Sequence, residues 1–402
     1  MGFRFKYLTE LFPVYLAVFS MRLSFGLVVF TLPLYLGHRY LSIGIVASSY
    51  PLLELLSIFP LGILSDKYGR KPVIVAGLLL SALDLPLFSL TRSVPLLTGI
   101  HAVQGVAAAA VMASSLAAIS DKAKESHRGR EMGIFDFSNL AGYMFGFPLS
   151  GLLVDLTGEL KVCFFTASLI AAIGLLFAIK VLPSEKPLSP EISVVRRIVL
   201  TMRNIRISRG APLLAVLWFT VMMYVSFILS FGSSLWKELS RGSGLGFAEF
   251  GLGFGLIILI LAVTQPTLGA VSDRIGRDKS LMISSSSITI LLVVFILLLQ
   301  GILDLLVAIP LVMVFGLGAL MFSPAGLAAL ADASMEEVRG SFMGFYSFTM
   351  NLGNLTGPVI GGLLLNYLGM KEGITAMLIV GVILTGWCSL ALAKKNLRRG
   401  SP

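Results

Sequence analysis

Three charged side chains lie in the middle of long apolar stretches: Arg22, Glu54 and Asp84. Arg22 and Glu54 are about 15 Å or more from either end of their stretches, and Asp84 is about 10 Å from the nearer end of its own, at about 1.5 Å per helical residue. Burying one such charge in hydrocarbon costs on the order of 2.5 to 3.5 kcal/mol, so each of them needs a partner or water. A carboxylate beside an arginine stays ionised, and it can bind a proton when the arginine moves away. We therefore expect Glu54 or Asp84 to take up and release a proton, with Arg22 as counter-charge; a purely structural buried ion pair is the alternative.

A further polar pair follows in the next apolar stretch, in the sequence His101-Ala-Val-Gln104-Gly105. An imidazole titrates near neutral pH, so His101 could join the proton transfer, with Gln104 beside it in a central cavity. However, His101 lies only about 9 Å from the outer end of its stretch. We therefore favour the simpler interpretation, in which His101 is a polar residue that lines an outer vestibule.

The elements that hold these side chains must be helices that cross a membrane. Hydrophobic residues make up 56% of the 402-residue chain and charged residues only 13%, which is unsuited to a surface in water. Apolar stretches of 18 or more residues recur along the whole length, and each can cross a hydrocarbon core of about 30 Å. The predicted spans are residues 12–36, 43–65, 72–91, 96–120, 132–155, 161–182, 212–236, 246–271, 280–300, 305–331, 341–366 and 372–393.

The basic residues predict the orientation of these twelve spans. With both termini in the cytoplasm, 24 of the 31 Lys and Arg residues fall on the cytoplasmic side, as the positive-inside rule requires. The net charge of +10 is spread over short loops, so we expect no nucleic-acid partner. The longest connection, residues 183–211, joins residues 1–182 to residues 212–402 and is either an amphipathic helix at the membrane surface or a flexible linker.

The two halves of the chain are related by an internal repeat. Residues 116–158 align with residues 327–369 at 16 identities in 43 positions, which indicates a duplication. Parallel repeats in a membrane protein describe two halves related by an axis along the membrane normal, with a binding site near mid-depth. The three buried charges are not duplicated, since Met223 aligns with Arg22 and Leu261 aligns with Glu54.

A charged loop occurs once in each half, between the second and third helices and between the eighth and ninth. The first copy reads Gly62-Ile-Leu-Ser-Asp66-Lys67-Tyr-Gly69-Arg70-Lys71, and the second reads Gly269-Ala-Val-Ser-Asp273-Arg274-Ile-Gly276-Arg277-Asp278. Glycines at helix ends permit a tight turn. The acid can bind a neighbouring helix N-terminus, and the arginine, one turn away, seeks a carboxylate. The spaced glycines and the second copy argue against a loop that serves orientation alone.

This loop resembles the signature of the major facilitator superfamily, G-x-x-x-D-[RK]-x-G-[RK]-[RK], and the resemblance extends over the whole chain. It implies two pseudo-symmetric bundles of six helices each, in an all-α integral membrane protein. It also implies a cytoplasmic gate network that locks the outward-open state, in which the motif acid and arginine join an acid at the end of the fourth helix of each half. The residues implied are Asp66, Arg70 and Asp121 in the first half and Asp273, Arg277 and Asp332 in the second. Asp278 stands where the pattern has a basic residue, and it is expected to weaken the gate contacts of the second loop.

Glycine motifs in the fifth and eleventh helices resemble the antiporter motif of the same family. Residues 142–151 match it only in part, because Phe147 precedes the proline, whereas residues 353–362 match it completely. Small residues four apart also allow close helix packing and proline bends a helix, so antiport and ordinary packing both remain open. The motif residues are Gly142, Gly146, Pro148 and Gly151, then Gly353, Gly357, Pro358, Gly361 and Gly362.

The function expected from these features is secondary active transport by alternating access, in the form of proton-coupled export of a small lipophilic or amphipathic compound. Methionine and aromatic residues in the seventh and eleventh helices suggest the lipophilic substrate. Proton-coupled import of a sugar, organic acid or other nutrient is the alternative. We expect a monomer in the plasma membrane that uses protons and needs no cofactor or metal. The sequence contains no motif of a metalloprotease, a serine hydrolase or an ATPase, so an enzyme and an ATP-driven pump are disfavoured.

Overall fold

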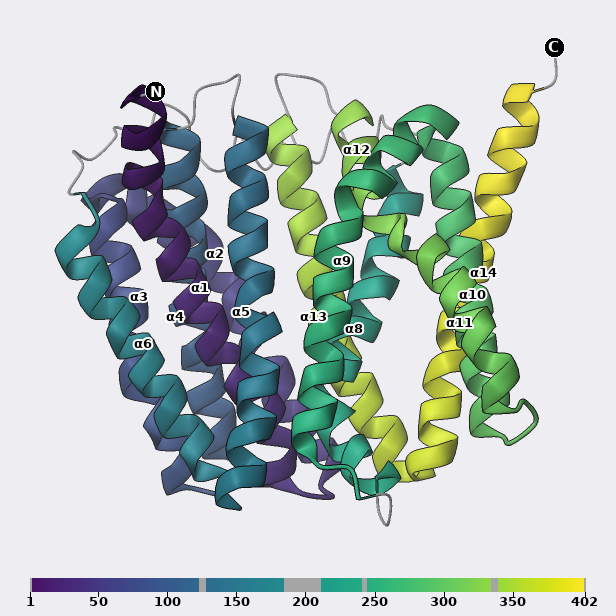
Figure 1. The fold of residues 1–402 in the computed structure, drawn as a ribbon, viewed down its shortest axis with the longest axis horizontal. Helices are drawn as coiled ribbons and strands as arrows, with labels where there is room; N and C mark the ends of the chain where they lie inside the picture. Colours follow the sequence, from purple (N-terminus) through teal and green to yellow (C-terminus); the bar gives the residue numbers. More distant parts are fainter. Residues whose placement is uncertain (1, 123–127, 184–210, 241–243, 334–338, 401–402) are drawn as a thin grey trace. The chain divides into compact units, whose positions relative to one another are not determined.

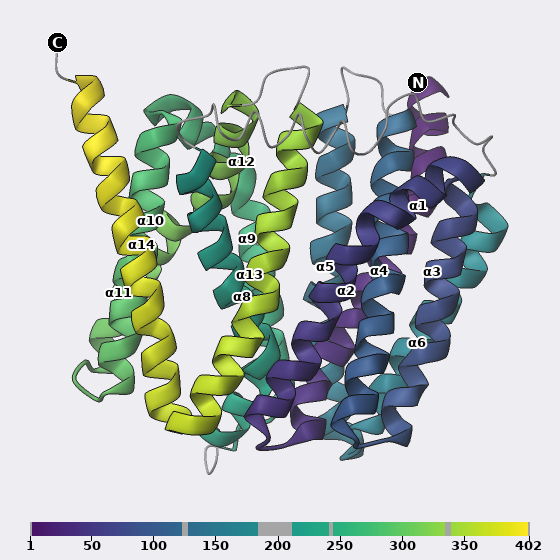
Figure 2. The ribbon, with the colours of Figure 1, turned by 180° about the vertical axis from the view of Figure 1, so that it is seen from behind.

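The computed structural model describes residues 2–122, 128–183, 211–240, 244–333 and 339–400, and these residues form helices joined by short turns (Figure 1; Figure 2). The helices are α1 (Gly2–Leu36), α2 (Tyr40–Tyr68), α3 (Arg70–Asp84), the 3-10 helix η1 (Leu85–Leu90), α4 (Val94–Lys122), α5 (Arg128–Thr157), α6 (Lys161–Val181), α8 (Ala211–Leu239), α9 (Phe247–Ile275), α10 (Arg277–Leu299), α11 (Leu305–Leu320), α12 (Phe322–Ala333), α13 (Arg339–Leu368) and α14 (Met370–Gly400). The predicted connection helix lies outside these residues.

Helices occupy all twelve predicted spans, and eleven of them contain a described stretch long and apolar enough to cross a membrane. The twelfth is α13, whose side chains are described from Phe348 onward. Two spans are not the continuous α-helices that we expected. The span at 72–91 changes from α3 to the tighter helix η1, where Pro86 lacks the N–H group of a regular α-helical turn. The span at 305–331 is divided at Met321 into α11 and α12.

The described residues form two compact units. One contains residues from 1–191 together with 227–262, and the other contains residues from 192–226 together with 263–402. The division of the chain into halves at the connection 183–211 remains a prediction.

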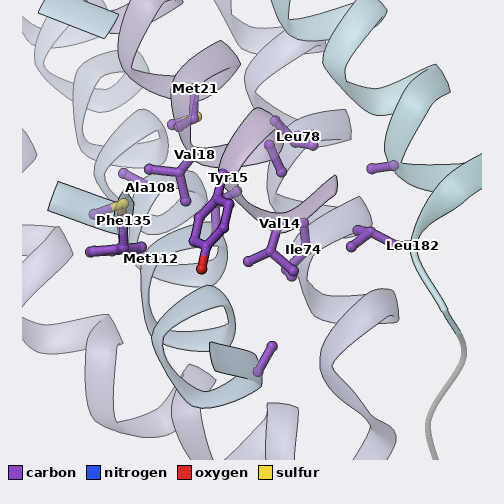
Figure 3. Packing of buried hydrophobic residues seen from close by; sticks show 14 of the residues in the cluster. Val14, Tyr15, Val18, Met21, Ile74, Leu78, Ala108, Met112, Phe135 and Leu182 are labelled. Atoms are coloured by element: carbon purple, nitrogen blue, oxygen red, sulfur yellow. The ribbon is translucent and has the colours of Figure 1, made fainter. Parts of the chain in front are cut away.

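Helix α1 forms the centre of the first unit. Its apolar residues are distributed around the whole circumference, and 83% of its most apolar 18-residue window is buried, more than in any other described span. A helix that is apolar on all sides packs in the interior. Figure 3 shows Tyr15, Val18 and Met21 of α1 among residues of the surrounding helices, which are Ile74, Leu78, Ala108, Met112 and Phe135.

A core of the second unit forms around Leu217 and Trp218 of α8. Phe322 of α12 contacts Trp218, with ring centroids 4.4 Å apart, and Leu281 of α10 and Cys388 of α14 complete the cluster. Aromatic pairs at this separation contribute to packing beyond the area that they bury.

The glycine motifs lie at seams where helices meet closely. A Cβ atom on Gly142 of α5 would lie 2.4 Å from the Cβ of Arg22 on α1, and one on Gly357 of α13 would lie 2.2 Å from a backbone oxygen of α8. Gly142 therefore allows α5 to pack closely against α1, and Gly357 allows α13 to pack closely against α8. A role of the motif residues in antiport remains a prediction.

Substitution of Gly142 by alanine should destabilise the α1–α5 seam. The added methyl group has no room beside Arg22, so we expect a loss of about 1 to 3 kcal/mol in stability. Gly133, on the same helix, is the matched control, because no described atom lies within 4 Å of its Cβ position. Gly133→Ala should leave stability unchanged or raise it by up to about 1 kcal/mol. Thermal unfolding in detergent measures both, and equal effects would contradict the close contact.

Candidate functional site

An ion pair between α1 and α2 is buried at mid-depth in the first unit. The Nη2 atom of Arg22 lies 3.4 Å from Oε1 of Glu54, and the two side chains are only 10% and 12% exposed. The structure thus brings together two of the three charges that the sequence singled out. Each charge offsets part of the free-energy cost of removing the other from water.

Three uncharged side chains fix the guanidinium group of Arg22. Its Nε donates to Oδ1 of Asn139 at 2.7 Å, and its Nη1 donates to the hydroxyls of Tyr50 at 2.8 Å and Tyr143 at 3.5 Å. Asn139 and Tyr143 come from α5 and Tyr50 from α2. The arginine therefore keeps hydrogen-bond acceptors even if Glu54 becomes protonated, whereas Glu54 has Arg22 as its cationic partner.

These three supporting residues were not among those expected from the sequence, although the repeat contains a signal for two of them. The positions that align with Tyr50 and Asn139 in the second half are Ile257 and Met350, both apolar. The same asymmetry marks Arg22 and Glu54. Polar residues that lack a polar counterpart in the repeat therefore converge on a single site in the first half.

Aromatic rings surround this ion pair. Phe25 stacks on Tyr50 with centroids 4.1 Å apart and also faces the ring of His101 at 6.1 Å. The Nδ1 atom of His101 lies 2.8 Å from Oε1 of Gln104, and the histidine is only 2% exposed. In this conformation His101 is enclosed because Phe25 and Phe88 cover it. Its expected place at an outer vestibule remains a prediction.

Asp84 does not join the ion pair. It is the last residue of α3 and only 3% exposed, and neither carboxylate oxygen has a hydrogen-bond partner among the described residues. A buried ionised carboxylate without a partner is costly. Arg22 is therefore the counter-charge of Glu54 and not of Asp84 in this structure. Which of the two acids takes up a proton remains a prediction.

The first charged loop forms a closed hydrogen-bond network. Gly69 connects α2 to α3 with a φ of 96°, a backbone conformation that favours glycine. The next residue, Arg70, has a side chain only 9% exposed; its Nη2 lies 2.9 Å from Oδ2 of Asp121 and its Nη1 pairs with Asp66. Nη1 also donates to Oγ of Ser65 at 2.9 Å. The three residues that the family resemblance implied therefore do meet.

The second copy is more open to solvent. Gly276 has a similar φ of 94°, and Nη1 of Arg277 pairs with Asp273. The exposed fractions of these two side chains are 30% and 61%, against 9% and 38% in the first copy. The side chain of Asp332 lies outside the described residues. Surface ion pairs contribute little to stability, so the second copy is the weaker one within the described contacts.

The serine that precedes the acid in both loops was also missed. Ser65 accepts from Arg70, and Ser272 accepts from Arg277 at 3.4 Å. Both serines are almost fully buried, at 1% and 0% exposed. Their signal in the sequence is that the same residue type occupies the same place in the two copies.

The apolar residues proposed to suit a lipophilic substrate are mostly internal in α8. Met223, Phe227 and Phe231 are 1%, 4% and 0% exposed, and the Tyr224 hydroxyl hydrogen-bonds to the backbone oxygen of Met377. In this conformation they pack against neighbouring helices. The side chains of Met343, Phe345 and Tyr346 lie outside the described residues.

Sequence comparisons match the whole chain. The family model of the Major Facilitator Superfamily matches residues 14–260 and 230–400. The chain is 25% identical over 410 residues to a multi-drug resistance efflux pump PmrA homolog of Lactococcus lactis, covering 98% of this chain and 96% of that protein. It is also 25% identical over 400 residues to the multidrug resistance protein MdtG of Escherichia fergusonii, covering 95% and 94%.

Solved structures of membrane transporters have the same fold as this chain. A bacterial homologue of the human lysosomal transporter Spinster, in an inward-facing and unoccupied conformation, matches with a TM-score of 0.77 and 13% identity over 99% of both chains. The nucleoside transporter NupG matches with a TM-score of 0.71 and 17% identity, covering 97% of this chain and 98% of that one. At these identities the likeness extends to the fold alone.

The two loops should respond differently to loss of an acid. Asp121→Asn removes the charge that Arg70 contacts through Nη2 and through Nε, which lies 3.0 Å from Oδ2 of Asp121, so we expect stability to fall by about 1 kcal/mol. Asp273→Asn removes an exposed partner, and we expect a change within about 0.5 kcal/mol. Thermal unfolding of the two variants in the same detergent provides the comparison. Equal losses would show that the difference in burial has no energetic consequence.

Proposed function

The chain belongs to the major facilitator superfamily and is a membrane transporter, not an enzyme; from this premise we propose that it exports a small lipophilic or amphipathic compound in exchange for protons. The observation that carries proton coupling is the buried pair of Arg22 and Glu54. Efflux is supported by the names of the relatives from Lactococcus lactis and Escherichia fergusonii.

Glu54 is the proposed proton carrier. When it is ionised, Arg22 holds it across the α1–α2 contact; when it binds a proton, the ionic attraction ends. Arg22 then remains attached to Asn139 and Tyr50, so the cation stays in place while its partner is released. Protonation thereby changes the charge of the site without unfolding it. A change of this kind can bias a transporter between two conformations if each conformation favours one protonation state.

The proposed moving parts are the halves at residues 1–182 and 212–402, joined by residues 183–211. Alternating access needs contacts that form in one conformation and break in the other. We assign the role of cytoplasmic lock to Arg70 with Asp66 and Asp121, in agreement with its closed network. The loop with Arg277, Asp273 and Asp332 is the proposed second lock.

This multi-pass membrane protein is proposed to act as a monomer in the plasma membrane with both termini in the cytoplasm. The distribution of Lys and Arg supports this orientation. It places the charged loops on the cytoplasmic side and the α5–α6 and α8–α9 turns on the opposite side.

Import of a nutrient with protons is the second candidate, because Arg22 could bind the carboxylate of a substrate. Inside-out vesicles distinguish the two directions. After the interior is acidified, an exporter that exchanges its substrate for protons should accumulate a radiolabelled compound, and collapse of the gradient should release it. A compound for this assay can be selected by thermal shift against a chemically diverse panel, since ligands that bind the folded state raise its apparent stability. A lack of accumulation together with uptake in whole cells would favour the importer.

Substitution of Glu54 tests the coupling. In proteoliposomes, Glu54→Gln should reduce gradient-driven transport to about a tenth or less, since a coupling free energy of about 1.4 kcal/mol corresponds to a tenfold change. Substrate counterflow, which needs no net proton movement, should persist. Asp84→Asn is the comparison, because that carboxyl group is buried but has no contact with Arg22.

Two outcomes would contradict this assignment. If both variants kept full gradient-driven transport, neither acid would carry the coupling proton. If Glu54→Gln lost counterflow and gradient-driven transport together, the ion pair would be a structural contact.

A further inference from the structure

The far end of α5 carries a carboxylate that binds the beginning of α9. Asp155 accepts a hydrogen bond from the backbone N–H of Phe247 through Oδ1 at 3.1 Å, and one from the N–H of Ala248 through Oδ2 at 2.6 Å. These two residues are the first of α9. The contact lies at the end of the first unit opposite the N-terminus (Figure 1).

Helix α9 has no side chain of its own at the position that normally caps a helix start. The residue before Phe247 is Gly246, which has no side-chain oxygen to offer to the exposed N–H groups of the first turn. Glu249 accepts the N–H of Gly246 at 2.7 Å and leaves the next two N–H groups to Asp155. A negative charge at this place also matches the positive end of the helix dipole. The cap of α9 is thus supplied by another helix.

Further contacts near this one involve α1, α5, α8 and α9. The Nε1 atom of Trp236 donates to the backbone oxygen of Gly246 at 2.8 Å, and its ring stacks on Phe250 with centroids 5.4 Å apart. The hydroxyl of Ser233 on α8 donates to the backbone oxygen of Phe30 on α1 at 2.7 Å. A Cβ atom on Gly151 would lie 2.2 Å from the backbone oxygen of Phe247. Helices α1 and α5 therefore pack closely against these parts of α8 and α9.

We propose that Asp155 is a positioning residue of the transport cycle, a latch that holds this end of the protein closed. The inference rests on the proposed function in one respect, namely that α5 and α9 belong to halves that move apart at this end. If they do, the two hydrogen bonds must break each time this end opens and re-form each time it closes. The repeat position of Asp155 is Asn366, so within the repeat alignment only the first half carries a charge here.

A latch of this kind must be weak enough to release. Asp155 and its two hydrogen bonds are exposed, so water can compete for both partners when the helices separate. A charged acceptor is stronger than a neutral one, yet solvent limits its contribution. The arrangement suits a reversible contact.

Labelling of a buried reporter cysteine tests the latch in the full-length protein. Leu34 is 7% exposed and belongs to the apolar cluster of Phe30 and Phe147, against which Phe247 and Phe250 pack. In the Leu34→Cys background, Asp155→Ala should raise the rate of modification by a membrane-impermeant maleimide by about threefold to tenfold, as expected from the loss of charge-assisted hydrogen bonds. Asp155→Asn, which keeps one neutral acceptor, should give a smaller increase.

Two controls separate opening from other effects. Glu159→Gln removes an exposed carboxylate from the turn just after α5, and the labelling rate should not change. Ala108 lies in the interior of the first unit and is 0% exposed. A reporter cysteine at this position, Ala108→Cys, should therefore stay unlabelled in the Asp155 variants. The native cysteines, Cys163 and Cys388, are buried, and the protein without a reporter supplies their background.

The labelling rate is measured without substrate and without a proton gradient. The test of the latch is therefore independent of whether the protein exports or imports its substrate. Faster labelling of Leu34→Cys in Asp155→Ala by reagent on the side of the α5–α6 turn, with Ala108→Cys still protected, supports the latch. Faster labelling only from the side of the charged loops overturns it. An unchanged rate overturns it. Equal increases at both reporters, or an equal increase with Glu159→Gln, also overturn it, because they indicate loosened folding or a general charge effect.

Discussion

The requirement that every buried charge find compensation inside the protein governs the organisation of this transporter. Arg22 lies where hydrocarbon would otherwise surround it, so its guanidinium group draws α1, α2 and α5 together through Glu54, Tyr50 and Asn139. The contact depends in turn on close helix approach, since Gly142 leaves room for the backbone and Cβ of Arg22. Packing and charge therefore support each other at the same level of the bundle.

The duplicated chain combines a shared framework with an unshared site. Both halves contain the positive-φ glycine and the arginine–aspartate pair of the charged loop. The buried pair of Arg22 and Glu54 has no equivalent at the aligned positions of the second half, where the repeat places Met223 and Leu261. The shared loops give both halves the same framework, whereas the buried ion pair distinguishes the first half from the second. The cost of each additional charge in the membrane explains why such a pair is not repeated without need.

Carboxylates also organise the ends of the helices. On the side of the charged loops, Asp66 and Asp121 bind an arginine, and at the opposite end Asp155 binds the first N–H groups of α9. Both contacts lie near water, where charge-assisted hydrogen bonds can be exchanged for hydration at modest cost. The mid-depth pair of Arg22 and Glu54 has less access to solvent, so its charges depend on partners inside the protein.

The sequence by itself determined the number and places of the membrane spans, the duplication, the charged loops and two members of the central ion pair. These features rest on apolar length, on repeated residues and on the cost of charge in lipid, all of which are local or visible in an alignment of the chain with itself. Only the tertiary structure decided which acid faces Arg22, that His101 is enclosed, and that Asp155 caps α9. Those facts depend on how helices distant in sequence are rotated and packed, which hydropathy does not specify.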